Sequence, residues 1–213
     1  MKPGILKEQF IPDSIFLHVV KGGVRFFDGN KSYTVKAGEY EVARKNRLAK
    51  FELLETNEDF VPLVFCFDEP FLREFLTKHQ TKIVDDKTKD AFVKIKKIEL
   101  MEDFIRSLKQ YHKDVMQLDE AFESLKYEEL LIILLRSQPE LSGILFDFGI
   151  PDKINLEAFM NRNFHFNVSL NRFTFLTGRS LSAFKRDFKK IFNDTPSHWL
   201  VKRRLHEAYF IWK

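Results

Sequence analysis

The stretch SLNRFTFLTGRSLSAFKRDFKKIF, residues 169–192, decides the fold of the C-terminal third of the chain. Ser169 and Ser180 are favoured N-cap residues, and each precedes a run whose apolar residues recur at helical spacing. Gly178 stands between the two runs, where a helix often ends in the left-handed conformation that glycine adopts without strain. The sequence therefore predicts two short helices separated by a tight turn, the second over residues 181–192.

The spacing of three residues in this stretch is that of a helix-turn-helix. Thr174, Gly178 and Phe184 lie where the motif needs a small residue, a turn glycine and an apolar anchor. Thr174 is larger than the alanine usual at the first position, a departure that the motif tolerates. The inner face of the second helix is then expected to be apolar, and it carries Leu181, Phe184, Phe188 and Ile191.

The opposite face of the second helix is polar and basic. Its residues are Ser182, Lys185, Arg186, Lys189 and Lys190. Because the N-terminal half of a recognition helix enters the major groove of DNA, we expect Ser182, Lys185 and Arg186 to face base edges. Lys189 and Lys190, nearer the end of the helix, are expected to contact phosphates. The pattern alone also fits a cationic surface helix of an ordinary helical bundle.

Positive charge is concentrated in the same part of the chain. The 213 residues carry a net charge of +4, but residues 152–213 hold 12 Lys and Arg against 5 Asp and Glu, a net of +7. The rest of the chain therefore carries a net charge of −3. This asymmetry indicates a polyanionic partner for the C-terminal segment, such as double-stranded DNA, although a solvated basic face has the same composition.

A third helix is expected after this motif, because Thr195 is an N-cap residue type and Pro196 suits the first helical position. With this helix included, the stretch 159–208 resembles the AraC/XylS family of bacterial transcription regulators. The motifs that carry the resemblance are LTGRSLS at 176–182, FKR at 184–186, Phe188, and P-x-x-W-L-x-x-x-R-L-x-x-A at 196–208. The resemblance implies a cytoplasmic, sequence-specific DNA-binding regulator in which Pro196 and Trp199 help to pack the motif.

The resemblance also implies two helix-turn-helix units joined by a long helix, of which only the first lies within residues 151–213. We therefore expect truncation after the first unit, as a fragment of a longer polypeptide or as a form with one reading head. Basic residues around the groove-facing helix are expected to contact phosphates: Arg172, Arg179, Lys189, Lys190, Lys202, Arg203 and Arg204. For Arg204, a tie between the third helix and the core is a competing role.

The first seventy residues have the pattern of short strands. Strands are predicted at 15–20, 24–27, 32–35, 39–43, 50–54 and 61–67. Asp28-Gly29-Asn30 predicts a hairpin turn, because Asp-Gly accepts the positive φ of a tight turn. Short strands at regular spacing are typical of a small sandwich or barrel, and they resemble the cupin-like domain of the family named above. The predicted fold class is thus α+β, a β-domain followed by helices.

We divide the chain into a cupin-like β-domain at 1–97, a helical spacer at 98–150 and the helix-turn-helix segment at 151–213. Gly149-Ile150-Pro151 marks the second boundary, because the residue before proline avoids the helical region. The spacer is predicted to hold helices at 98–113, 119–137 and 139–148, which are too apolar for a mere linker. We expect them to pack on the β-domain and to present an outer face to a second copy, which would make a homodimer.

Other function classes find little support in the sequence. The six histidines are scattered and no nucleophile elbow or phosphate loop is present, so we expect no metal, no cofactor and no catalytic residue. His18 and Cys66 are expected to be buried core residues. No apolar run approaches the ~20 residues that span a membrane. A small-molecule or protein effector at the β-domain is expected, but the sequence identifies neither effector, operator nor the direction of regulation.

Two alternatives to a DNA-binding regulator stay open at this point. One is a protein- or ligand-binding interaction module whose DNA-binding head is incomplete. The other, more remote, is a cupin enzyme, which would need a bound metal.

Overall fold

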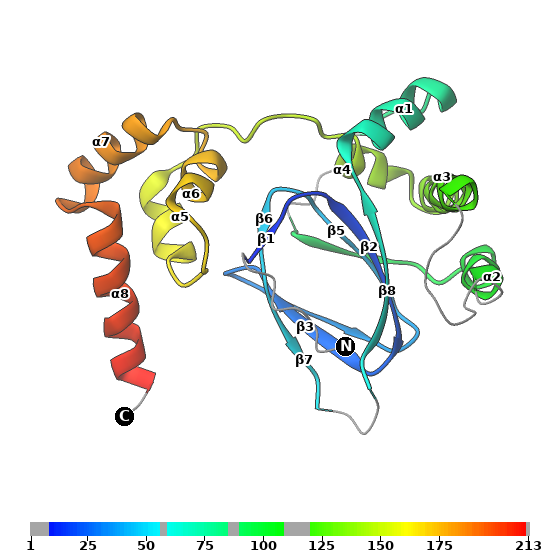
Figure 1. Cartoon of the computed structure of the whole chain (residues 1–213), viewed down its shortest axis with the longest axis horizontal. Coiled ribbons are helices and arrows are strands. Elements are labelled where there is room, and N and C mark those ends of the chain that lie inside the picture. Colours follow the sequence, from blue (N-terminus) through cyan, green and yellow to red (C-terminus); the bar gives the residue numbers. More distant parts are fainter. Residues whose placement is uncertain (1–8, 56–58, 85–89, 109–119, 212–213) are drawn as a thin grey trace.

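The computed structural model describes residues 9–55, 59–84, 90–108 and 120–211. This part of the chain is α+β, with strands in the N-terminal region and helices after it, which confirms the predicted fold class. Figure 1 shows the strands as facing layers, with the helices of the middle segment on one side of them. The C-terminal helices lie on the opposite side.

The strands form two main sheets and one short pair, all antiparallel. They are β1 (Phe10–Ile11), β2 (Ser14–Lys21), β3 (Gly23–Phe27), β4 (Ser32–Lys36), β5 (Tyr40–Ala43), β6 (Arg47–Leu48), β7 (Lys50–Leu53), β8 (Val61–Phe67) and β9 (Phe92–Ile95). The sheet orders are β8-β2-β5-β9, β4-β3-β7 and β1-β6. Val24 and Val35 of one main sheet pack with Leu17 and Val19 of the other, so the two sheets enclose an apolar interior.

The turn between β3 and β4 is the Asp-Gly turn that the sequence predicts. Gly29 adopts a positive φ of 93°, which glycine accepts without strain. The Asp28 Oδ1 atom accepts hydrogen bonds from the backbone N–H groups of Asn30 and Lys31, each at 2.8 Å. The same carboxylate lies 3.5 Å from the Arg162 guanidinium, so this turn also contacts the C-terminal helices.

The β8-β2-β5-β9 sheet is covered on both faces, because successive side chains of a strand point to opposite sides. Phe16, Val42 and Phe65 pack with the helices of the middle segment and are at most 4% exposed. Leu17 and Glu41, which are partners across β2 and β5, face the other sheet. The cavity between the sheets is therefore lined by apolar atoms, and Glu41 contributes only the apolar part of its side chain to it.

The same alternation corrects one prediction. Cys66 is exposed rather than buried, because Phe65 and Phe67 on either side of it face the helices and turn its thiol to the opposite side. His18 is 6% exposed, and its Nδ1 atom lies 3.1 Å from the Glu39 carbonyl oxygen. Its expected place in the core is confirmed.

The middle segment packs short helices on the outer face of this sheet. They are α1 (Glu69–His79), α2 (Glu99–Leu108), α3 (Glu120–Ser137), the 3-10 helix η2 (Pro139–Leu141) and α4 (Ser142–Leu145). Leu130, Leu131 and Leu134 of α3 are 0% exposed and share a core with Phe16 and Phe65. The predicted packing of these helices on the strands is thus confirmed. The predicted helical residues 109–113 and 119 lie outside the described residues.

The C-terminal unit consists of α5 (Leu156–Asn163), α6 (Leu170–Leu176), α7 (Leu181–Phe192) and α8 (Pro196–Ile211). The hydroxyl oxygens of Ser169 and Ser180 accept hydrogen bonds from backbone N–H groups at the starts of α6 and α7, which confirms both predicted N-caps. Phe10 and Leu48, from β1 and β6, belong to the core of this unit. The C-terminal helices are therefore docked on the strands. None of the described helices has the length and apolar content of a membrane span.

Candidate nucleic-acid interface

α7 is anchored by two phenylalanines on its inner face. Phe184 and Phe188 are 0% exposed, and Phe188 meets Trp199 of α8 edge-on with the ring centres 5.5 Å apart. Leu181 and Ile191 are 39% and 42% exposed, so the prediction that they pack inward is wrong. These two residues stand in the first and last turns of α7, where the neighbouring helices no longer cover the edges of the apolar face.

The turn before α7 is pressed against the segment that joins the two halves of the molecule. Gly178 has a φ of +61°, and a Cβ atom there would lie 2.6 Å from backbone atoms of Asp152 and Lys153. Thr174, 6% exposed, donates a hydrogen bond from its hydroxyl to the Asn171 carbonyl oxygen at 2.8 Å. The turn therefore needs glycine for two reasons, its backbone conformation and the close approach of residues 152–153.

The outer face of α7 is open to solvent. The exposed residues on it are Ser182, Lys185, Arg186, Lys189 and Lys190. Figure 1 shows α7 and α8 at the end of the molecule farthest from α1, α2 and α3. The cationic side of α7 thus stands clear of the rest of the chain, as a groove-binding helix requires.

Asp187 is the acidic residue within this basic stretch of α7. Its carboxylate lies 3.4 Å from the Arg179 Nε atom, 3.3 Å from the Arg186 Nη2 atom and 3.9 Å from the Lys153 Nζ atom. Partial burial alone would raise the pKa of the Asp187 carboxyl, but hydrogen bonds from Arg179 and Arg186 keep it below its usual value. Asp187 therefore holds the guanidinium group of Arg186, a role that no sequence pattern had indicated.

Arg179 is a structural residue, which corrects the prediction that it contacts phosphate. Its side chain is only 7% exposed, and its Nη1 atom donates hydrogen bonds to the carbonyl oxygens of Ile154 at 2.9 Å and Thr177 at 2.6 Å. The Nε atom pairs with Asp187. These hydrogen bonds tie the segment before α5 to α7, and they keep the Arg179 guanidinium turned away from solvent.

Arg204 likewise points inward, and the competing role stated above, a tie between the third helix and the core, is the one observed. The Nε and Nη2 atoms donate hydrogen bonds to the carbonyl oxygens of Phe164 at 2.6 Å and Phe166 at 2.8 Å. The residue thereby ties α8 to the loop between α5 and α6. Its neighbour Arg203 is exposed, with its guanidinium carbon 5.3 Å from the centre of the Phe164 ring.

Arg172 is the third basic residue whose predicted phosphate contact the structure does not support. Its guanidinium carbon lies 3.7 Å from the centre of the Phe10 ring in β1. Close to it, the Gln9 side-chain oxygen accepts a hydrogen bond from the Asn167 backbone N–H at 2.9 Å. Arg172 therefore connects α6 to the N-terminal strands.

The start of α8 is well ordered by side-chain caps. The Thr195 hydroxyl oxygen accepts a weak hydrogen bond from the His198 backbone N–H at 3.4 Å, and Pro196, in the first helical position, is buried. The His198 Nδ1 atom lies 2.7 Å from the Asp194 carboxylate, and this hydrogen bond keeps the pKa of that carboxyl below its usual value. Lys202, one turn further along, is exposed on the same helix.

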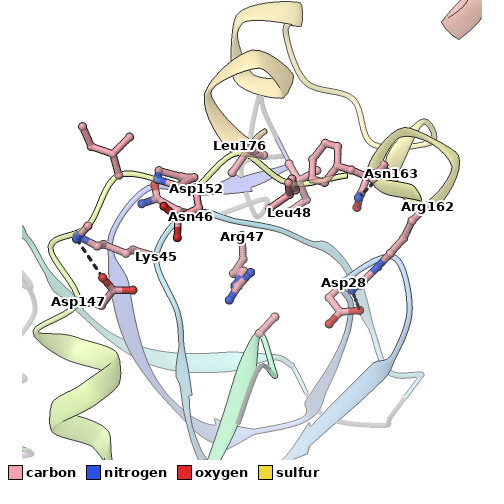
Figure 2. Close-up of a pocket in the computed structure, with 16 residues that line it drawn as sticks. Asp28, Lys45, Asn46, Arg47, Leu48, Asp147, Asp152, Arg162, Asn163 and Leu176 are labelled. Carbon is pink, nitrogen blue, oxygen red and sulfur yellow. Dashed lines mark hydrogen bonds and ion pairs between the residues drawn. The ribbon is translucent and has the colours of Figure 1, made fainter. Parts of the chain in front are cut away.

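A cavity of about 650 Å³ lies between the strands and the C-terminal unit. Figure 2 shows Arg47 of β6 pointing into it, with the ion pair of Asp28 and Arg162 on one side. Burial and neighbouring guanidinium groups lower the pKa of Arg47. Sequence reasoning placed Asp28 in a turn but predicted no cavity, because the residues that line it come from distant segments that meet only when the two units dock.

The described residues contain no candidate metal site. Within residues 9–55, 59–84, 90–108 and 120–211, no group of three or more His, Cys, Asp and Glu side chains is arranged to hold a metal ion.

The chain is similar to one protein family and to several solved structures. Residues 14–144 match the family model described as the ExsA N-terminal regulatory domain. The chain is similar to a substituted form of apo ToxT from Vibrio cholerae, at 14% identity and a TM-score of 0.51, over 91% of this chain and 90% of that one. It is also similar to the AraC-like transcriptional activator CuxR, at 9% identity and a TM-score of 0.39, over 93% and 68%. A search of curated proteins finds no match.

Proposed function

Since the chain belongs to the ExsA N-terminal regulatory domain family, we propose that it is an AraC-like transcription regulator and that it binds double-stranded DNA through α7. The observation that carries this proposal is the division of α7 into two faces. Phe184 and Phe188 are fully buried, while Lys185, Arg186 and Lys189 are exposed on the opposite side. A helix whose apolar face packs on the protein and whose opposite face is basic and exposed is suited to the major groove.

Within the groove, the N-terminal half of α7 would supply the base contacts. Ser182, Lys185 and Arg186 would face base edges, and a good bidentate Arg–guanine pair is worth about 1–3 kcal/mol of discrimination. The Asp187 carboxylate, 3.3 Å from Arg186, would orient that guanidinium before DNA arrives. Sequence preference would therefore depend most on Arg186.

Phosphate contacts would come from a smaller set than the sequence predicts. Lys189, Lys190, Lys202 and Arg203 are exposed, and we assign the backbone contacts to them. Arg172, Arg179 and Arg204 are left out, because their guanidinium groups are engaged within the chain. These three arginines would instead stabilise the conformation of α6, α7 and α8.

We assign the other functions to the segments predicted from the sequence, residues 1–97 for effector binding and 98–150 for dimerisation. Leu100 of α2 and Leu125 of α3 are 50% and 62% exposed, and they line a groove of about 420 Å³ together with Ile132 and Ile133. A second copy of the chain would cover this groove. Twofold symmetry would then present two α7 helices to spaced half-sites. Nothing in this scheme requires catalysis.

Selection of bound sequences from a random DNA library tests the proposal directly. The wild-type protein should enrich one motif, and the Lys185→Ala/Arg186→Ala double variant should bind that motif at least tenfold more weakly. Lys21→Ala is the matched control, because Lys21 is an exposed lysine of β2, outside the C-terminal helices. Equal binding by the double variant and the control would remove α7 from the interface. Failure of the wild-type protein to enrich any motif would favour the interaction-module alternative instead.

A further inference from the structure

His165 lies in the loop between α5 and α6, where the C-terminal unit meets the strand region. The centre of its ring is 5.5 Å from that of Phe27, at the end of β3, and 4.5 Å from that of Phe166 in the same loop. Two residues further along, the Asn167 backbone N–H donates a hydrogen bond to the Gln9 side-chain oxygen at 2.9 Å. The imidazole of His165 is therefore packed into the junction between the two halves of the molecule.

The surroundings of this imidazole suit only its neutral form. The His165 Nε2 atom is buried, and none of the described residues forms a hydrogen bond with it. An imidazolium carries a proton on both ring nitrogens, so a protonated His165 would have a charged donor at Nε2 without an acceptor. Burying such a donor costs free energy. The packed junction therefore opposes protonation of the ring.

Two of the three charged groups that act on His165 oppose its protonation as well. Lys50 of β7 and Arg204 of α8 repel a proton on this ring, whereas Glu207 of α8 attracts one. Burial has the largest effect, and together with the two cations it lowers the pKa of His165 below its ordinary value of 6.5. The imidazole thus stays neutral as long as these elements remain packed around it.

Arg204 connects the ring to α8. Its Nε and Nη2 atoms donate hydrogen bonds to the carbonyl oxygens of Phe164 and Phe166, the residues on either side of His165. On the side of the strands, the Lys50 Nζ atom lies 5.9 Å from the centre of the Phe166 ring. A positive charge on the imidazole would repel both cations. It would therefore weaken the contacts that join β7, the loop and α8.

We propose that His165 makes the attachment of the C-terminal unit to the strand region dependent on pH. The neutral ring packs at the junction, and uptake of a proton detaches the loop that carries it from the strands. This inference goes beyond the proposed function, because it concerns the junction between the units and needs no bound DNA. The competing explanation of a junction that weakens in acid is protonation of a carboxylate there, such as Asp28, which lies 3.5 Å from Arg162.

The direction of the pH effect follows from the number of protons that each form binds. The detached ring titrates near its ordinary pKa of 6.5, and the packed ring has a lower pKa. Below about pH 6.5 the detached form therefore binds more protons, so attachment is strongest above this pH and weakens as the pH falls. At pH 5.5 about nine-tenths of the detached rings are protonated, which increases the equilibrium constant for detachment by up to about tenfold.

Hydrogen exchange of the full chain, followed by NMR at pH 7.5 and pH 5.5 and corrected for the intrinsic exchange rates, tests the proposal. The Asn167 backbone N–H reports on detachment, because it is bonded to the Gln9 side chain. The Val42 N–H in the central strand β5 serves as the internal reference. In the wild-type protein, the opening constant at Asn167 relative to that at Val42 should be about three- to tenfold larger at pH 5.5 than at pH 7.5.

His165→Phe removes the titrating group and keeps an aromatic ring in the loop, so its relative opening constant should change less than about twofold between the two pH values. His206→Gln is the matched control, because His206 is an exposed histidine of α8, and it should respond as the wild type does. Lys50→Met should reduce the pH effect and Glu207→Gln should increase it, since they remove a cation and an anion that act on the ring. Circular dichroism would verify that each variant folds.

Two outcomes would overturn the proposal. One is an opening constant at Asn167 of the wild-type protein that does not change with pH. The other is the same acid response in His165→Phe as in the wild type, which would assign the effect to a carboxylate. DNA selection is measured separately, so neither outcome bears on the proposed function.

Discussion

The Arg172 guanidinium lies over the ring of Phe10, 3.7 Å from its centre, and joins the first helix of the helix-turn-helix to the first strand of the N-terminal region. These two residues are far apart in sequence, and neither belongs to a pattern that predicts the contact. Around them, Asp28 pairs with Arg162 and Gly178 lies against Asp152. The C-terminal unit is therefore held to the strand region by Arg172 and Arg162, which would allow a change in one to affect the other.

Phe10→Leu should weaken this junction. The substitution keeps an apolar side chain but removes the ring under Arg172, and the lost cation–π contact is worth ~0.5–2 kcal/mol. Urea unfolding, followed by circular dichroism and tryptophan fluorescence, should show a loss of about this size in the free energy of unfolding. Phe51→Leu is the control, because Phe51 is a partly exposed strand residue that is not part of the apolar core in which Phe10 packs with α6. Equal losses in the two variants would argue against a special role for the Phe10 ring.

Two basic residues of α7 should affect DNA binding in different ways. Lys189→Ala should weaken binding to all sequences alike and reduce the slope of log affinity against log salt by about one, as expected for one phosphate contact. Arg186→Ala should instead relax the preference at one base position. Affinities measured over a series of salt concentrations, with matched and singly altered DNA sites, separate the two effects. An equal loss at every site for Arg186→Ala would assign Arg186 to the backbone.

Arg204→Ala should destabilise the protein, because two carbonyl oxygens would lose a charged donor. Hydrogen bonds to charged groups contribute about 1.5–3 kcal/mol each, so the loss of two predicts a decrease of roughly 3–6 kcal/mol in the free energy of unfolding. Arg203→Ala, which removes an exposed neighbour, should cost less than about 1 kcal/mol. Denaturant unfolding of both variants decides the matter. Normal stability of Arg204→Ala combined with weaker DNA binding would restore the phosphate contact that the sequence predicts.

Local patterns explain which parts of this molecule could be predicted from the sequence. The caps at Ser169 and Ser180 and the turn at Asp28-Gly29 depend on neighbouring residues only, and the structure has all three. The inward position of Arg179 was not predictable in this way, and for Arg204 the sequence left a phosphate contact and a tie to the core as alternatives. Basic residues near a recognition helix have the composition of DNA contacts, and only the folded chain brings the Ile154 and Phe164 carbonyl oxygens to their guanidinium groups.

The two cavities show the same limit. Glu41 stands in a strand whose pattern indicates nothing unusual, and its burial becomes visible only in the folded chain. Arg47 points into a space that exists because β6 and the C-terminal helices meet. Cys66 was misjudged for a related reason, since an apolar run in a strand does not tell which of its two faces is covered.

Gly178→Ala should destabilise the helix-turn-helix more than an ordinary glycine substitution. The positive φ and the approach of the Asp152 and Lys153 backbone to 2.6 Å both oppose a Cβ atom, so we expect a loss of ~2 kcal/mol or more. For a chain of this size that corresponds to a fall in Tm of ~4–8 °C. Gly149→Ala is the control, because a Cβ there would meet only a flexible Asp147 side chain. Calorimetry that gave equal Tm values for both variants would contradict the observed close approach.

Glu41 should make the stability of the protein depend on pH in a direction opposite to that of a salt-bridged carboxylate. Burial raises the pKa of this carboxyl from its ordinary value of 4.5 to about 7, so between these values the folded state binds more protons than the unfolded state. The free energy of unfolding contributed by this group is therefore full below about pH 4.5 and is lost as the pH rises toward 7. The shift corresponds to roughly 3 kcal/mol. Because other groups also titrate in this range, the quantity to measure is the difference between wild type and Glu41→Gln. That difference should turn in favour of the glutamine variant as the pH rises from 4.5 to 7. A difference that stays constant across this range would mean that Glu41 titrates as an exposed carboxyl does.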